Sequence, residues 1–158
     1  MELILWRHAE AEPGDPDAAR TLTARGHKQA LRMAEWLDAT LPNSCRVFCS
    51  PTRRTIQTAE ALGRKFKVSA ELAPESTVER ILTVANWPDS RDPVLIVGHQ
   101  PALGQLAALL IAGNQQDWTI RKANAWWIMR RERAADDDPC SHTGNYLRAV
   151  MTPDLVRK

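Results

Sequence analysis

The stretch LILWRHAEA, residues 3–11, decides how the rest of the chain is interpreted. Its apolar residues 3–6 show no helical period, which predicts a short strand buried on both faces. The run then ends abruptly in Arg7 and His8. Either these two side chains end the strand at the surface by chance, or the strand serves to hold them in place.

Beyond this strand, the sequence alternates between helical and strand patterns as far as residue 113. A loop rich in Pro, Gly and Asp follows the first strand, and Thr23 is the predicted N-cap of the first helix. Ser50 and Pro51 are expected to open the second helix, as its N-cap and first residue. Helices are predicted at about 24–40, from 50 onward, at 75–84 and at 102–113, and strands at 46–49, 67–72 and 93–98.

This alternation indicates a parallel sheet with helices on both faces. Residues 124–131 and 145–151 have the pattern of two further strands, joined by the polar, solvated loop 132–144. We therefore expect an α/β fold in three layers, α/β/α, with a mostly parallel central sheet and closing C-terminal strands of mixed orientation. Because there is no internal repeat and no long linker, residues 1–158 are expected to form a single domain.

Composition argues against several classes of protein. The formal net charge of +2 is too small for a general nucleic-acid binder, and no segment approaches the roughly 18 apolar residues of a membrane span. Met1-Glu2 lacks the basic region that begins a signal peptide. The three cysteines, Cys45, Cys49 and Cys140, include no C-x-x-C pair, so a disulfide framework is not expected. We expect a soluble cytoplasmic protein with no nucleic-acid and no membrane partner.

Cationic side chains follow three of the predicted strands. Arg7 and His8 end the first strand, Arg54 comes shortly after the second, and His99 follows the strongly apolar strand at 93–98. In open α/β sheets, ligands bind outside the carboxyl ends of the strands, so these side chains are expected at one rim. Two of the segments also open helices, whose N-termini favour anions. Arginine forks, imidazoles and helix N-termini together predict a phosphate site.

Taken singly, each of these signals has a simpler explanation. An Arg-His dipeptide is common, and Arg53-Arg54 could be a solvated helix face. Convergence of all of them at strand ends favours a site, because chance placement does not predict it.

Four motifs, in order, resemble those of the histidine phosphatase superfamily, which has a phosphoglycerate mutase-like fold. LILWRHAEA is similar to its Arg-His-Gly/Ala signature, LTARGHKQA (22–30) to its Leu-Thr-x-x-Gly-x-x-Gln-Ala segment, and SPTRRTIQTAE (50–60) to its Ser-Pro-x-x-Arg-x-x-Gln-Thr-Ala segment. VLIVGHQP (94–101) is similar to its strand ending in Gly/Ser-His-x-Pro. The short chain, Ala9 in place of the commoner Gly, and ARTLT (19–23) resemble the SixA branch of small phosphohistidine phosphatases.

The resemblance implies roles for these residues. His8 would be the nucleophile that forms a phosphohistidine intermediate, Arg7 and Arg54 would clamp the phosphoryl oxygens, and His99 would stabilise the transfer. The further substrate-binding candidates are Arg20 and Ser50, whereas Arg53 is expected to point away from the phosphate. Phosphoryl transfer needs mainly positioning and charge stabilisation, which arginines supply, and a neutral imidazole is a competent nucleophile. No metal and no other cofactor is expected, since the four histidines show no paired-ligand spacing.

A dedicated proton donor is hard to find in the sequence. Larger members of the superfamily carry a glutamate that protonates a leaving alkoxide, and the candidates here are Glu10, Asp15, Glu75 and Glu79, all of which also fit solvated positions. Phosphohistidine leaves as an imidazole, which solvent can protonate at neutral pH. The missing acid, together with a shorter chain and hence a more open cleft, therefore favours phosphohistidine over an alkyl phosphate.

The predicted function is hydrolysis of protein phosphohistidine through phosphorylated His8. The expected partner is a phosphorylated signalling protein, the ligand held in the site is phosphate or sulfate, and the chain is expected to be a monomer. Two alternatives stay open, a phosphomonoesterase for sugar or other small phosphates and a non-catalytic phosphate-binding module. Trp126 and Trp127 alternate faces, so one is expected in the core and the other against a helix or the rim, where it could also serve as a substrate platform.

Overall fold

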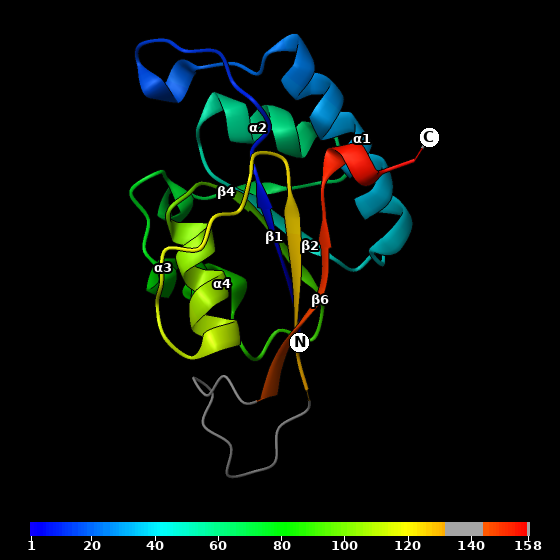
Figure 1. Ribbon diagram of the computed structural model, residues 1–158, viewed down its shortest axis with the longest axis vertical. Coiled ribbons are helices and arrows are strands. Elements are labelled where there is room, and N and C mark those ends of the chain that lie inside the picture. The colour runs from blue at the N-terminus through cyan, green and yellow to red at the C-terminus, as the bar shows by residue number, and fades with distance from the viewer. Residues whose placement is uncertain (132–143, 158) are drawn as a thin grey trace.

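The computed structural model describes residues 1–131 and 144–157 and has a six-stranded sheet between two layers of helices (Figure 1). The strands are β1 (Glu2–Arg7), β2 (Arg46–Cys49), β3 (Lys67–Val68), β4 (Val94–Gly98), β5 (Ala125–Arg130) and β6 (Asn145–Met151). The helices are α1 (Ala24–Thr40), α2 (Arg53–Glu60), α3 (Val78–Ala85) and α4 (Ala102–Ala112), with 3-10 turns η1 (Asp17–Ala19), η2 (Ala70–Leu72) and η4 (Pro153–Leu155). Residues 132–143 of the predicted loop 132–144, with Cys140 and His142, lie outside the described residues. None of the helices described is long and apolar enough to cross a membrane.

The strand order is β3-β2-β4-β1-β5-β6. The pairs β1–β4, β4–β2 and β2–β3 are parallel, whereas β5 runs antiparallel to β1, and β6 antiparallel to β5. The expected three-layer fold with mixed closing strands is therefore confirmed. Leu3 to Trp6 of β1 are fully buried, as a strand with neighbours on both edges and helices on both faces must be.

Alternation along the strands divides the core in two. Ile4 and Trp6 face the cluster beneath α1 and α2, whereas Leu3 and Leu5 face the cluster beneath α3 and α4. Figure 1 shows these two pairs of helices on opposite sides of the strands. Both layers pack against β1, so its backbone is fixed by packing as well as by hydrogen bonds.

The two tryptophans of β5 divide between these layers. Trp127 is buried and meets Trp36 of α1 edge-on, with ring centroids 6.0 Å apart. Trp126 is half-buried on the opposite face, 6.1 Å from the ring of Trp118. The expectation of one core tryptophan and one packed more peripherally is confirmed, and the contact that Trp126 makes is with another apolar ring.

Several helix ends differ from the sequence predictions. Thr23 caps α1 as predicted, since its hydroxyl accepts from Gly26 N at 2.9 Å. The prediction that Ser50 and Pro51 open α2 is wrong, because the N-cap is Thr52 and the Ser50 hydroxyl bonds to His99 instead.

Two later elements also differ in extent. The helix predicted at 75–84 begins at Val78, because Thr77 is its N-cap and accepts from Arg80 N. The strand predicted at 67–72 is the two-residue β3, followed by the turn η2.

Gly26 allows α1 to lie against the chain that leaves β1. A Cβ atom at this position would come within 2.0 Å of the Glu10 carbonyl oxygen. The same oxygen accepts from Thr23 N at 3.0 Å, which ties the start of α1 to a residue two positions after His8. The glycine is required by this close approach of two backbones.

We expect Gly26→Ala to lower the free energy of unfolding by about 1–3 kcal/mol, the usual cost of forcing extra atoms into a packed site. Chemical denaturation measures the change. Glu35→Ala, on the exposed face of the same helix, is the control and should change the stability by less than about 0.5 kcal/mol. A Gly26→Ala protein as stable as the wild type would contradict this close approach.

Candidate active site

Side chains from three elements meet at the carboxyl end of the parallel strands. His8 directly follows β1, His99 directly follows β4, and Arg54 lies in the first turn of α2. The imidazole centroids of His8 and His99 are 5.3 Å apart with the rings tilted by 54°. Nη2 of Arg54 is 3.4 Å from Nδ1 of His99. The structure therefore brings these three side chains together at the rim where the sequence predicts them.

The hydrogen bond of His8 fixes which ring nitrogen is free. Nδ1 of His8 lies 2.7 Å from the carbonyl oxygen of Ala9. A carbonyl oxygen can only accept, so Nδ1 carries the proton and Nε2 keeps its lone pair. His8 is thus presented as a neutral imidazole with Nε2 as its nucleophilic atom.

His99 has the opposite tautomer. Arg54 can only donate, so Nδ1 of His99 accepts from it, and the proton of the neutral ring lies on Nε2. Nε2 donates to the fully buried hydroxyl of Ser50 at 2.7 Å, with Thr52 Oγ1 at 3.4 Å. Ser50 therefore orients His99, and its direct contact with a substrate stays a prediction.

Both imidazoles are kept neutral by their surroundings. Burial first, and then the positive charges of Arg54, Arg7 and Lys122, lower the pKa of His8 to about 4, against the opposing effect of the hydrogen bond to the Ala9 carbonyl. Burial, then His8 and Arg54, lower the pKa of His99 to about 3. At neutral pH, His8 therefore carries an unprotonated nitrogen ready to attack an electrophile.

Two arginines supply positive charge at this rim. Arg54 is almost wholly buried, and its Nη1 and Nη2 donate to Asp17. Arg7, at the end of β1, donates from Nη1 to the carbonyl oxygen of Ile120 at 2.9 Å. Within the described part of the chain, neither buried Nε atom has a hydrogen-bond partner. A tetrahedral oxyanion is the ligand that such N–H groups suit, since guanidinium forks match phosphate oxygens.

Asp17 is a residue of the site that the sequence analysis missed. Its Oδ2 accepts from Arg54 Nη2 at 3.0 Å, and its Oδ1 from Arg20 Nη1 at 3.0 Å. These two guanidinium partners, Arg20 first, lower the pKa of the Asp17 carboxyl, so it is ionised at neutral pH. A negative charge therefore already lies on the arginine expected to hold a phosphoryl group.

Arg20 reaches the site only through this carboxylate. Its Nε donates to the carbonyl oxygen of Glu12 at 2.7 Å, and its direct contact with a phosphate stays a prediction. Arg53 is exposed, as expected from the spacing of the motif.

The four candidate acids make other contacts or are exposed. Glu10 Oε2 accepts from the hydroxyl of Thr23 at 2.8 Å, and Asp15, Glu75 and Glu79 are exposed. Among the described residues, no hydrogen bond or ion pair joins any of the four to the imidazoles or to Arg54. The described residues also contain no group of three or more His, Cys, Asp or Glu side chains that could hold a metal ion.

The chain is similar in sequence to known proteins. The sequence profile of the histidine phosphatase superfamily (branch 1) matches residues 3–77. The chain is 31% identical over 122 residues to phosphohistidine phosphatase SixA of Escherichia coli, covering 72% of this chain and 76% of that protein. It is 31% identical over 163 residues to an uncharacterised protein of Picosynechococcus, covering 97% of each.

Solved structures show the same fold. One is a protein from Nakamurella multipartitia assigned as a phosphohistidine phosphatase SixA, with a TM-score of 0.77 and 26% identity over 96% of this chain and 95% of that chain. Another is the protein histidine phosphatase SixA complexed with tungstate, with a TM-score of 0.75 and 23% identity over 99% of this chain and 100% of that chain.

The lowered pKa of His8 predicts how stability depends on pH. Between the ordinary pKa near 6.5 and about 4, the unfolded chain binds a proton at this residue that the folded chain does not. Stability is therefore lost as the pH falls through this window, by up to about 1.4 kcal/mol per pH unit. Denaturant unfolding at several pH values should show a steeper loss for the wild type than for His8→Gln, and superimposable profiles would contradict the assigned shift.

The carboxylate on Arg54 predicts competition with anions. Asp17→Asn removes the negative charge, so inorganic phosphate should bind more tightly, by roughly fivefold for an exposed ion pair. Isothermal titration calorimetry measures the dissociation constant. Asp38→Asn is the matched control, since Asp38 is equally exposed and paired with Arg64, and it should leave phosphate binding unchanged. Weaker binding in Asp17→Asn would mean that Asp17 orients Arg54 for the anion instead.

Proposed function

Because the chain belongs to the histidine phosphatase superfamily and is homologous to its SixA-type members, we propose that it hydrolyses phosphohistidine on proteins without a metal. His8 is the nucleophile in this proposal. Arg7 and Arg54 hold the phosphoryl oxygens, and His99 contacts the same group. The coarser assignment, a phosphatase, rests on the family.

The observation that carries the proposal is that a nucleophilic nitrogen and arginine N–H groups without hydrogen-bond partners occur in the same site. Nε2 of His8 has a lone pair, and its ring lies within the electrostatic reach of the buried Arg54 and the half-buried Arg7, whose Nε–H groups lack partners in the described part of the chain. Phosphoryl transfer requires an in-line nucleophile and cations on the equatorial oxygens. This set of groups supplies both.

The first step transfers the phosphoryl group to the enzyme. Nε2 of His8 forms a bond to phosphorus while the bond between phosphorus and the substrate imidazole breaks. The electron pair of that bond stays on the leaving nitrogen, which takes a proton from water. The two arginines hold the oxygens throughout, so their positive charge stabilises the transition state.

The second step restores His8. Water attacks phosphorus, the bond to Nε2 breaks, and its electron pair returns to the ring, which remains protonated on Nδ1 by the hydrogen bond to Ala9. The attacking water releases a proton, which balances the one taken up in the first step. The net reaction consumes one water and yields free histidine and phosphate.

The surroundings of the nucleophile favour an imidazole leaving group. Of the carboxylates in the described residues, Asp17 is the one bonded to the arginines of the site, and its lowered pKa keeps it ionised and unable to donate a proton. An alkoxide needs a proton donor to leave, whereas an imidazole is protonated by solvent near neutral pH. Homology to SixA supports the same substrate class.

His8→Gln should abolish turnover of p-nitrophenyl phosphate, with a loss of at least about a thousandfold, because no covalent intermediate can form. The phosphoenzyme of the wild type should be acid-labile and base-stable, and it should be absent in this variant. His27→Gln is the matched control, an exposed histidine of α1 expected to keep full activity. Turnover retained in His8→Gln would refute the nucleophile.

The substrate class needs its own comparison. We expect a higher kcat/KM on a histidine phosphotransfer domain phosphorylated with phosphoramidate than on phosphoserine or glucose 6-phosphate. Release of inorganic phosphate measures all three. Faster hydrolysis of either small phosphate would favour the phosphomonoesterase alternative.

A further inference from the structure

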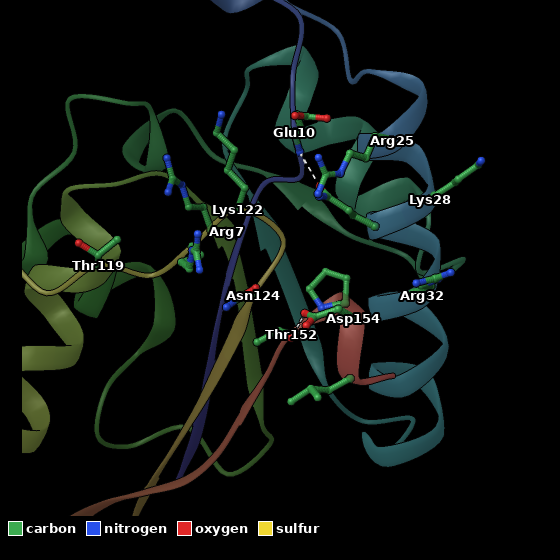
Figure 2. A pocket seen from close by; sticks show the side chains of 14 residues that line it. Arg7, Glu10, Arg25, Lys28, Arg32, Thr119, Lys122, Asn124, Thr152 and Asp154 are labelled. Carbon is green, nitrogen blue, oxygen red and sulfur yellow. Dashed lines mark hydrogen bonds between the residues drawn. The ribbon is translucent and has the colours of Figure 1, made fainter. Parts of the chain in front are cut away.

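A second feature adjoins the catalytic rim, a cavity of about 900 Å³ that we call the basic hollow (Figure 2). It lies between α1, the segment before β5 and the turn η4 near the C-terminus. Its lining residues are Arg7, Glu10, Arg25, Lys28, Gln29, Arg32, Thr119, Arg121, Lys122, Asn124, Thr152, Pro153, Asp154 and Leu155. Six of them are cations and two are carboxylates, a far stronger bias than the net charge of +2 for the whole chain.

The cations come from both sides of the hollow. Arg25, Lys28 and Arg32 are spaced three and four residues apart, which places them along one face of α1. Arg121 and Lys122 come from the opposite side, in the segment that leads into β5. Figure 2 shows Arg25 extending from α1 toward the side on which Arg7 and Lys122 lie. The positive charges therefore surround the hollow.

No ion pair compensates these positive charges within the described residues. In the parts of the chain that the structure describes, none of Arg25, Lys28, Arg32, Arg121 and Lys122 forms an ion pair, and all five are exposed. The two carboxylates are bonded to hydroxyl groups, Glu10 to that of Thr23 and Asp154 to that of Thr152. Arg121 attracts Asp154 electrostatically without forming an ion pair with it. The hollow thus presents a positive field to any approaching molecule.

An apolar side chain lies within this basic rim. Leu155 lines the hollow and is 64% exposed, next to Pro153 of the same turn. Protein interfaces commonly combine an apolar contact with a charged or polar rim. Nucleic-acid surfaces do not need such a residue, because their affinity comes mainly from phosphate contacts.

The hollow is continuous with the catalytic groups. Arg7 lines it and also belongs to the proposed phosphoryl clamp, and its Nη1 bonds to Ile120 beside Arg121. Ala123 N donates to the carbonyl oxygen of His8 at 3.0 Å, so the segment that carries Lys122 is anchored to the nucleophile itself. A molecule seated in the hollow would therefore contact Arg7, one of the two arginines proposed to hold its phosphoryl group.

We infer that the basic hollow docks an acidic face of the protein that carries the phosphohistidine, with Arg25, Lys28, Arg32 and Arg121 contacting carboxylates and Leu155 an apolar side chain. This inference rests on the proposed function and adds the kind of surface that the substrate presents. Docking by opposite charge raises the association rate, and salt screens it.

The test measures how reversing the charge of the basic hollow changes activity on two substrates. The triple variant R25E/K28E/R32E reverses the α1 side, and R121E reverses the other side independently, in case the triple variant folds poorly. The substrates are p-nitrophenyl phosphate and a histidine phosphotransfer domain that has been phosphorylated with phosphoramidate and has acidic residues around its histidine. The matched control is K65E/K67E/R91E, three exposed cations outside the hollow with the same change in net charge.

The inference expects the ratio of kcat/KM on the phosphoprotein to kcat/KM on p-nitrophenyl phosphate to fall at least tenfold in the triple variant and about threefold in R121E. The control should keep the wild-type ratio. Wild-type kcat/KM on the phosphoprotein should also fall with added salt, more steeply than that of the triple variant. Changing the acidic residues of the substrate to amides should lower wild-type kcat/KM and leave that of the triple variant unaltered.

Two results would overturn the inference and are distinct from failure of the proposed function. An unchanged ratio in both hollow variants, with the wild type hydrolysing the phosphoprotein, would show that docking occurs elsewhere. Tighter binding of a DNA or RNA oligonucleotide than of the phosphoprotein, lost in the triple variant, would assign the hollow to nucleic acid. If the wild type hydrolyses only p-nitrophenyl phosphate, the proposed substrate class fails, and the docking inference fails with it.

Discussion

The main-chain hydrogen bonds of His8 are the constraint on which the site depends. Its N–H donates to the Gly98 carbonyl at 3.2 Å, and its own carbonyl accepts from Ala123 N at 3.0 Å. His99 directly follows Gly98, so the same pairing of strands that holds the nucleophile also sets its distance from the second imidazole. A central strand with helices on both faces gives this backbone little freedom.

Charge around this fixed point is arranged so that cations concentrate while the imidazoles stay neutral. Burial and neighbouring guanidinium groups disfavour protonation of either ring, which keeps the lone pair of His8 available. Asp17 offsets part of this positive charge from an exposed position, where an incoming anion would compete with it for Arg54. Further cations lie along α1, where they line the basic hollow and could contact an acidic protein surface.

Much of this could be predicted from the sequence, because its signals are local. An apolar run such as residues 93–98 is typical of a buried strand, and three of the four ordered motifs place Arg7, His8, Arg54 and His99 at strand ends or helix starts. The start of α2 was missed because the Ser50 hydroxyl is taken by His99, 49 residues away. Asp17 was missed for a similar reason, since it meets Arg54 across 37 residues through a loop without a periodic pattern. The basic hollow joins three distant segments, and no single window of sequence contains it.

The two histidines differ in what holds them. The ring of His8 is oriented by a main-chain carbonyl, which every amino acid at position 9 would provide, whereas the ring of His99 is oriented by side chains, the hydroxyl of Ser50 and the guanidinium of Arg54. The orientation of the nucleophile thus depends on the backbone conformation and should tolerate substitutions of the neighbouring residue. The orientation of His99 depends on side chains that substitution can change, so the assisting imidazole is where gradual evolutionary change would first alter the chemistry.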